Sequence, residues 1–310
     1  MATEIKRGGV HDQPQLPNCR FAASIRLNPK YAGPEEKERR KWYRIAIEQY
    51  KEVLKMQPHF TPARFNLGVV YFKIGEYGKA IECYNKAIEL RPDMAKMYVN
   101  RGNAYACIEQ YDNAISDFNM ALRRDPKSVE AYNGLGHSRK EQGDYDRAVD
   151  EFIKAIHIKP QDPDLFFGRG SVFLDAGKYD DAVRDFNKAI ELNPKDAGAF
   201  NNLGIAYVRM NQMEEGIRSF EKAIELNPKD AGARKNLGAA YFIRGCQRMR
   251  RGRWSRAKMD LEAAKENGMD IAAEFADLFG SAAEFEARVG VPLLPKIAEL
   301  LNLTDGKDGD

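Results

Sequence analysis

A proline recurs every 34 residues along most of the chain. Six of the fourteen prolines keep this spacing: Pro58, Pro92, Pro126, Pro160, Pro194 and Pro228. A fixed period of this length is typical of stacked supersecondary units, each of which buries its apolar face against the next. The segment KAIELNPKDAGA also occurs twice without change, at 188–199 and 222–233. The sequence therefore predicts an array of repeats rather than one compact core.

Small residues recur within each unit. Reading each unit back from its proline places repeats at 61–94, 95–128, 129–162, 163–196, 197–230 and, for a longer sixth, 231–268. Glycine inside a helix costs about 1 kcal/mol relative to alanine, so a glycine that recurs at the eighth position indicates that two helices of a hairpin cross closely there. These glycines are Gly68, Gly102, Gly136, Gly170, Gly204 and Gly238. Large apolar residues recur on the second helix, at Tyr84, Phe118, Phe152, Phe186 and Phe220.

The whole pattern resembles the tetratricopeptide repeat (TPR): small residues at positions 8, 20 and 27, aromatic residues at 11, 17 and 24, and proline at 32. The resemblance implies an all-α fold, a right-handed superhelix (solenoid) of antiparallel helix hairpins with helical caps at both ends. The first helices of the hairpins would line a concave groove. The sixth repeat carries seven extra residues, and a frame starting near 238 with Gly245 as the small residue fits almost as well as one starting at 231.

The ends of the chain are less regular than the repeats. Residues 1–34 are predicted to be a mostly disordered leader that includes the end of a degenerate repeat at 21–30, FAASIRLNPK. Residues 35–60 are expected to form a capping helix or a partial repeat. Residues 269–303 are expected to form capping helices that cover the last repeat, because the ends of a solenoid need a covering unit. Residues 304–310 are expected to be a loose tail.

Asparagine recurs where the resemblance implies that the groove lies. Position six of the successive units holds Asn66, Asn100, Gly134, Gly168, Asn202 and Asn236. An asparagine side chain offers both a donor and an acceptor, so a row of them can hold the peptide bonds of an extended polypeptide. The predicted partner-binding surface also includes Asn103, Phe65, Lys73, Lys96, His137, Phe167, Arg209 and Lys235. The alternative is that asparagine is simply the common residue of the family at this position.

A second candidate surface is the arginine-rich segment RGCQRMRRGRWSRAK at 244–258. Arg244, Arg248 and Arg251 are spaced to share one face of a helix, and Trp254 lies close by in the sequence. Arginines beside an aromatic ring can hold phosphates and stack on bases, which is the basis for an RNA-binding hypothesis. An acidic protein partner, a solvated helix face, or a seat for the acidic C-terminal segment explains the cluster equally well.

The remaining features exclude several classes of function. The net charge is +3, from 49 basic and 46 acidic residues, so no global field favours nucleic acid or an anionic membrane. No apolar run reaches the length of a bilayer span. The four cysteines, Cys19, Cys83, Cys107 and Cys246, form no CxxC pair, which is typical of a reduced compartment without a zinc site.

No catalytic motif accompanies this architecture. The four histidines are scattered, and none lies in a metalloprotease motif or beside residues that could complete a catalytic triad. The sequence therefore predicts a cytoplasmic adaptor, not an enzyme, without cofactor or metal, that binds a protein or peptide. An RNA-associated protein and a regulatory subunit of a separate enzyme remain as alternatives. The sequence leaves the partner and the oligomeric state open.

Overall fold

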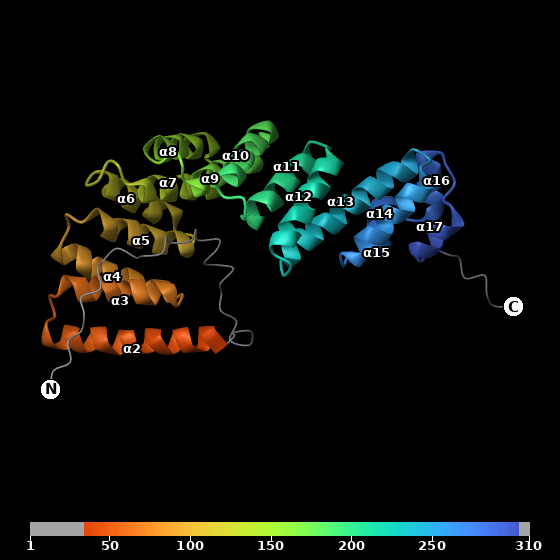
Figure 1. Cartoon of the computed structure of the whole chain (residues 1–310). Helices are drawn as coiled ribbons and strands as arrows, with labels where there is room; N and C mark the ends of the chain where they lie inside the picture. The colour runs from red at the N-terminus through yellow and green to blue at the C-terminus, as the bar shows by residue number, and fades with distance from the viewer. Residues whose placement is uncertain (1–33, 304–310) are drawn as a thin grey trace. The chain divides into compact units, whose positions relative to one another are not determined.

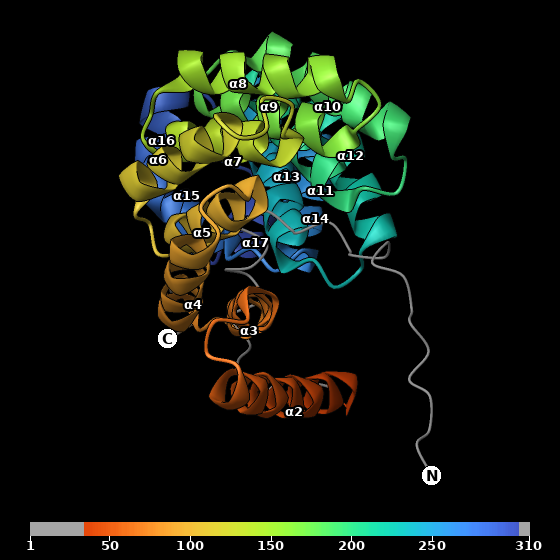
Figure 2. The ribbon, with the colours of Figure 1, turned by 90° about the vertical axis from the view of Figure 1, so that its left-hand side faces the viewer.

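The computed structural model describes residues 34–303, and within that range every regular element is a helix. The chain divides after Ile158 into two compact units. Each unit is built from consecutive helices that pack in pairs (Figures 1 and 2). The all-α architecture expected from the sequence is confirmed. None of the helices in this range has both the length and the apolar character needed to cross a bilayer.

In the described part of the first unit, the first helix is the long α2 (Pro34–Met56), in the region where the sequence predicts a capping helix or partial repeat. Three hairpins follow it. They are α3 (Thr61–Lys73) with α4 (Tyr77–Leu90), α5 (Ala95–Cys107) with α6 (Tyr111–Leu122), and α7 (Val129–Glu141) with α8 (Tyr145–Ile158).

The second unit has three further hairpins and ends in three short helices. The hairpins are α9 (Pro163–Asp175) with α10 (Tyr179–Leu192), α11 (Ala197–Arg209) with α12 (Met213–Leu226), and α13 (Ala231–Arg250) with α14 (Trp254–Glu266). The short helices are α15 (Ile271–Phe279), α16 (Ala282–Val289) and α17 (Pro295–Leu300).

The turn inside each hairpin is fixed by one residue with positive φ. This residue is the fifteenth of the unit in the first five repeats, and it adopts the left-handed conformation that favours glycine and, to a lesser degree, asparagine. The residues are Gly75, Glu109, Gly143, Gly177 and Asn211, with Gly252 in the sixth hairpin. Glu109 adopts φ 61° without being a glycine.

The helices of each hairpin cross where the eighth-position glycine meets a large side chain. A Cβ added to Gly204 would lie 2.6 Å from the ring of Phe220, which is buried. The other four regular hairpins have the same contact, between Gly68 and Tyr84, Gly102 and Phe118, Gly136 and Phe152, and Gly170 and Phe186. In all five, the two residues are 16 positions apart. The close crossing inferred from the glycine period is therefore present.

The same spacing decides the frame of the sixth hairpin. Gly245 packs against Leu261, 16 residues later, and a Cβ on Gly245 would lie 3.3 Å from the Leu261 side chain. Gly252 then occupies the fifteenth position, as the turn residue does in the other hairpins. The hairpin therefore follows the frame that starts at 238. The seven extra residues lengthen α13 at its N-terminal end, and because seven residues are about two helical turns, they keep its buried face in register.

The three short helices cover the last hairpin with an aromatic cluster. Phe275, Phe279 and Phe285 are buried, and their ring centroids lie 4.8–5.6 Å apart. They belong to one core with Met249 of α13 and Leu261 of α14. The helices α15, α16 and α17 all lie within residues 269–303. The leader, with the degenerate repeat end at 21–30, and the tail at 304–310 lie outside the described residues.

Candidate functional site

The first helices of successive hairpins contact one another within each unit. In the first unit, α3 contacts α5 and α5 contacts α7, while in the second unit α9 contacts α11 and α11 contacts α13. Side chains from neighbouring first helices therefore form one continuous surface in each unit. All the groove residues expected from the sequence lie on these helices.

In the first unit, the expected residues form an apolar patch with a cation beside it. Phe65 on α3 is half-buried, and its ring centroid lies 5.8 Å from that of Tyr84. The ammonium of Lys96, on α5, lies 6.0 Å from the centre of the Phe65 ring. Asn66 and Asn103 are half-exposed, and Lys73 is exposed. Residues of adjacent first helices are thus close enough to contact one partner side chain.

Asn100 differs from the other position-six asparagines. Its side chain is only 6% exposed, and its amide nitrogen donates a hydrogen bond of 2.8 Å to the carbonyl oxygen of Lys96 in the same helix. A partner that contacts the surface of α5 therefore cannot reach the Asn100 amide without displacing its neighbours. The expected row of four asparagines is thereby reduced to three accessible ones, Asn66, Asn202 and Asn236.

His137 lies against the core rather than out in solvent. Its ring meets the buried ring of Phe152 edge-on, with the centroids 5.2 Å apart. Leu135 is also buried, and it directly precedes Gly136, the residue at which α7 and α8 cross. His137 therefore contributes part of its surface to packing and part to the face of α7.

In the second unit, asparagine side chains from two first helices meet. The Asn236 amide, on α13, donates to the Oδ1 atom of Asn201 on α11 at 2.9 Å. The Asn201 amide in turn lies 3.4 Å from the Oδ1 atom of Asn202. Asn201 was not among the expected residues, although it directly precedes one of them. This chain of amides spans adjacent helices, as a ladder for a peptide backbone requires.

The other expected residues of the second unit border this chain. Phe167 on α9 is half-buried, with its ring centroid 5.9 Å from that of Phe186. Arg209 and Lys235 are exposed. The surface of the second unit therefore combines an aromatic ring, paired amides and two cations.

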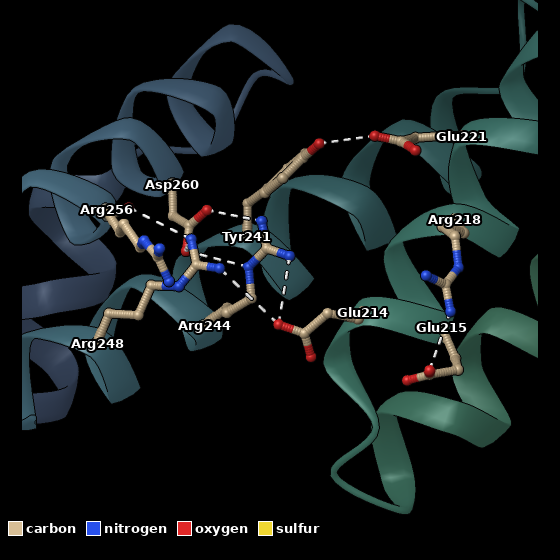
Figure 3. A network of polar contacts seen from close by, with 9 residues as sticks. All are labelled: Glu214, Glu215, Arg218, Glu221, Tyr241, Arg244, Arg248, Arg256 and Asp260. Atoms are coloured by element: carbon tan, nitrogen blue, oxygen red, sulfur yellow. Dashed lines mark hydrogen bonds and ion pairs between the residues drawn. The ribbon is translucent and has the colours of Figure 1, made fainter. Parts of the chain in front are cut away.

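The arginine-rich segment is largely occupied by contacts within the protein (Figure 3). Both Arg244 and Arg248, on α13, donate to the carboxylate of Asp260 on α14, at 2.8 and 2.7 Å respectively. The Asp260 side chain is only 4% exposed. Glu214 of α12 lies 3.7 Å from Arg244 and 3.8 Å from Arg248. Two carboxylates therefore compensate two arginines, and this part of the segment joins three helices.

The surroundings of Arg244 shift the pKa of two groups. Burial lowers the pKa of Arg244, but the hydrogen bond and the charge of Asp260 together raise it by more. The net shift of the Arg244 pKa is therefore upward. The phenol of Tyr241 donates to Glu221 of α12 at 2.8 Å. Burial and this bond raise the pKa of Tyr241 to about 12. The network thus favours the charged form of Arg244 and the neutral form of Tyr241.

The pairing of Arg244 with Asp260 has counterparts in two other hairpins, at a sequence spacing that could have been recognised from the sequence alone. Arg101 pairs with Asp117 at 2.6 Å, and Arg169 pairs with Asp185 at 2.7 Å. In every case the acid follows the arginine by 16 residues, as the large side chain follows the glycine. Arg101 also donates to Asn85 of the preceding second helix at 2.6 Å. These pairs clamp the second, fourth and sixth hairpins.

Arg251 and Trp254, the other two residues of the expected arginine patch, differ in burial. Arg251 is exposed in the turn between α13 and α14, with Arg250 and Arg253 beside it in the chain. Trp254 is half-buried and packs against the C-terminal core. The indole therefore contributes part of its surface to that core.

No group of three metal-ligating side chains that could hold an ion is found between residues 34 and 303. Of the cysteines, Cys83 and Cys246 are buried free thiols. Burial raises the pKa of Cys83 to about 11 and that of Cys246 to about 12, which disfavours the reactive thiolate. Both act as small packing residues.

Comparison with protein families gives one match that spans most of the chain. The model of the C-terminal domain of cilia and flagella-associated protein 70, a TPR domain, matches residues 39–275. No curated protein matches the chain.

Solved structures of TPR-type solenoids resemble the chain in fold. A chain of the APC/C hetero-tetramer Cut9–Hcn1 is 18% identical with a TM-score of 0.59, and the match covers 76% of this chain and 46% of that one. The structure of pilF of Pseudomonas aeruginosa is 17% identical with a TM-score of 0.55, and the match covers 74% of this chain and 96% of that one. TTC0263, a thermophilic TPR protein of Thermus thermophilus, is 20% identical with a TM-score of 0.51, and the match covers 58% of this chain and 98% of that one. At these identities the likeness shows the fold alone.

Proposed function

Because the chain belongs to the tetratricopeptide-repeat family represented by the C-terminal domain of cilia and flagella-associated protein 70, we propose that it is an interaction scaffold that binds an extended polypeptide segment. The binding surface in this proposal is the face made by the first helices. The scaffold positions its partner and performs no chemistry of its own. Membership of the family supports an interaction role in general, while the polypeptide and its site are our proposal.

The observation that carries the proposal is the chain of amides from Asn236 through Asn201 to Asn202. Each amide has a donor and an acceptor, and a peptide bond presents the complementary pair. A partner backbone can replace the bond of 3.4 Å between Asn201 and Asn202 with a shorter one at little cost. Exposed Arg209 and Lys235 on the same two helices favour a partner with acidic side chains.

In the first unit the same face supports a different contact. Phe65 and Lys96 form an apolar surface with a cation over one edge, and Asn66 lies next to Phe65 in the chain. An apolar partner side chain that packs on Phe65 would leave its backbone within reach of Asn66. The first unit by itself thus offers an anchor for a partner side chain, and the second unit by itself offers amides for a partner backbone.

Replacing Asn201, Asn202 and Asn236 of the second unit together by alanine is expected to weaken partner binding by about 100-fold. Each lost hydrogen bond contributes about 1 kcal/mol, and about 1.4 kcal/mol corresponds to a tenfold change in Kd. The measurement is affinity capture from native lysate by the full chain, followed by titration of the captured partner. Asn187, exposed on the second helix α10, gives the matched control Asn187→Ala, which should bind like the wild type. Equal capture by the triple variant, with its helicity intact, would contradict the asparagine model.

RNase treatment in the same capture experiment distinguishes binding of a polypeptide from binding of RNA through the arginine segment. Binding to phosphates through arginines falls steeply with salt and is lost when RNA is digested. The contacts of Arg244 and Arg248 with Asp260 leave the exposed Arg251, Arg253 and Arg256 for such binding, while Arg250 lies over the ring of Phe279. We therefore expect capture to survive RNase. A partner that is an enzyme, captured through the asparagine face, would make the chain its regulatory subunit.

A further inference from the structure

Three arginines at the turn between α13 and α14 carry charges that the hairpin does not compensate. Arg251, Arg253 and Arg256 are all exposed, and we call them the turn arginines. In the described part of the chain, none of their side chains takes part in an ion pair, whereas Arg248 is bound to Asp260. The backbone of the turn is fixed, because the amides of residues 251 and 253 both donate to the carbonyl oxygen of Arg248. The turn therefore presents a fixed group of positive charges.

The outer surface of α14 departs from that of the other second helices. Position 22 is polar in the other five hairpins and holds Met259 in the sixth, where this side chain is 67% exposed. Position 18 holds Ser255 in the sixth hairpin, but an acid in four of the other five: Asp112, Asp146, Asp180 and Glu214. Met259 and Arg256 are three residues apart on α14 and are thus neighbours on its surface. The sixth hairpin therefore lacks an acid and gains an exposed apolar side chain beside its arginines.

Helix α15 has an outer face of complementary character. Phe275 and Phe279 are buried in the C-terminal core. Glu274, Asp277 and Leu278 are exposed, and their spacing places them together on the opposite side of the helix. Leu278 is 47% exposed. Among residues 34–303, neither Glu274 nor Asp277 has an ion-pair partner. These three residues form what we call the acidic face of α15.

The turn arginines and the acidic face are neighbours on the surface of one copy. The guanidinium of Arg250 lies 5.3 Å from the centre of the Phe279 ring. Arg250 directly precedes the turn arginines, and Phe279 directly follows Leu278. Helices α14 and α15 also contact each other (Figure 1). Opposite charges thus lie side by side on the second unit without neutralising one another.

We propose that a second copy of this chain occupies this surface, in a two-fold dimer in which the turn arginines of each copy bind the acidic face of the other. A two-fold contact uses the same surface on both copies, so that surface must be self-complementary. Here it holds both signs of charge, and Met259 of one copy packs on Leu278 of the other. The inference does not rest on the partner polypeptide, because α14 is a second helix and lies outside the first-helix face.

An RNA strand explains this surface less well than a second copy does. Single-stranded nucleic acid follows a positively charged groove over several nucleotides. On α14 the positive charge ends early, because exposed Glu262 follows Met259 by three residues. A methionine side chain offers nothing to a phosphate but adapts well to an apolar side chain. The combination of cations, acids and exposed apolar groups therefore favours a protein surface, and the complementary one is on this chain.

The size of the contact predicts a weak dimer. The 13 residues of α14 and the 9 residues of α15 span about 20 Å and about 14 Å at 1.5 Å per residue. Faces about 10 Å wide then present roughly 340 Å² per copy, whereas a stable interface buries about 800 Å² per partner. We therefore expect an equilibrium between monomer and dimer, with the dimer populated at high concentration.

Sedimentation equilibrium of the full chain, at concentrations between about 10 μM and about 1 mM, measures the Kd of the dimer. One variant reverses the turn arginines (Arg251→Glu, Arg253→Glu, Arg256→Glu), and a second reverses the acidic face (Glu274→Arg, Asp277→Arg). Either variant alone places like charges across both contacts, so its Kd is expected to rise at least about tenfold. In an equal mixture of the two variants, every contact joins opposite charges again. The mixed dimer should therefore have a Kd within about threefold of the wild-type value.

The matched control carries the same change of charge elsewhere on the second unit: Arg184→Glu, Arg218→Glu and Lys222→Glu. These residues lie on α10 and α12, where each pairs with an acid at the surface. The control should dimerise like the wild type, and circular dichroism verifies that all variants keep their helices.

Four results would overturn the proposal. They are a wild type that stays monomeric, a mixture of the two variants that does not recover the dimer, a control that weakens the dimer as much as the reversed arginines do, and assembly that continues beyond the dimer. Loss of the dimer in the arginine variant alone, with the acidic-face variant unaffected, would also overturn it, because the arginines would then bind something other than α15.

Discussion

Asp260→Ala is expected to lower the free energy of unfolding of the second unit by about 3 kcal/mol, at the lower end of the range for breaking a buried ion pair. The carboxylate is 4% exposed and accepts hydrogen bonds from both Arg244 and Arg248. Removing it leaves two guanidinium groups, partly withdrawn from water, with only Glu214 nearby. The partial exposure of the arginines, 16% and 21%, is the reason for choosing the lower end.

Chemical denaturation with hydrogen exchange of the α13 and α14 amides measures this loss. Glu262→Ala is the matched control, because Glu262 also lies on α14 and pairs with a cation, Lys258, but at the surface and at 3.5 Å. Surface pairs contribute about 0–1 kcal/mol, so the control should change stability little. If Asp260→Ala cost no more than Glu262→Ala, the carboxylate would not be holding the three helices together.

Gly134→Leu is expected to destabilise the first unit by about 2–3 kcal/mol through overpacking. A Cβ at Gly134 would lie 2.4 Å from the ring of Phe118, and a Cβ at Gly102 would lie 2.9 Å from the same ring. Phe118 is fully buried between these two first helices, so it has no free space into which to move. The gain of about 1 kcal/mol from replacing a helical glycine is too small to offset the clash.

Thermal or urea unfolding of the full chain, followed in the first unit by exchange of the α5 and α7 amides, tests this prediction. Gly78→Ala on α4 is the control, since nothing lies within 4 Å of a Cβ built there. That change should be neutral or stabilise by up to about 1 kcal/mol. The two substitutions thus have opposite expected signs. A Gly134→Leu protein as stable as the Gly78→Ala protein would show that Phe118 is not confined.

The repeat architecture followed from the sequence because its causes are local and periodic. The proline period located the ends of the second helices, and the eighth-position glycines located the crossings that the structure shows at Gly68, Gly136 and Gly204. The absence of long apolar runs and of catalytic motifs also needed no structure to recognise. These features depend on residue types within one 34-residue unit, which a linear pattern displays directly.

The assignment of individual faces depended on contacts between units and between helices. Gly134 has a groove position by register, yet it is needed to accommodate Phe118 of the preceding hairpin. Asn100 has the same position and is buried, with its amide bonded inside its own helix. The register of a helix gives the direction of a side chain but not the size of the side chains that face it from neighbouring helices. Only the packed helices show which side chains those are.

The arginine segment shows the same division. The sequence determined that Arg244 and Arg248 share a face of one helix, while the structure showed that Asp260 and Glu214 compensate their charges. It also selected the frame at 238 for the sixth hairpin, because Gly245 and Leu261 meet there. The sequence by itself thus determined the repeat, its period and its helices. The tertiary structure decided which side chains are consumed by packing and pairing and which are left for a partner, because burial and charge compensation arise only when helices distant in the sequence come together.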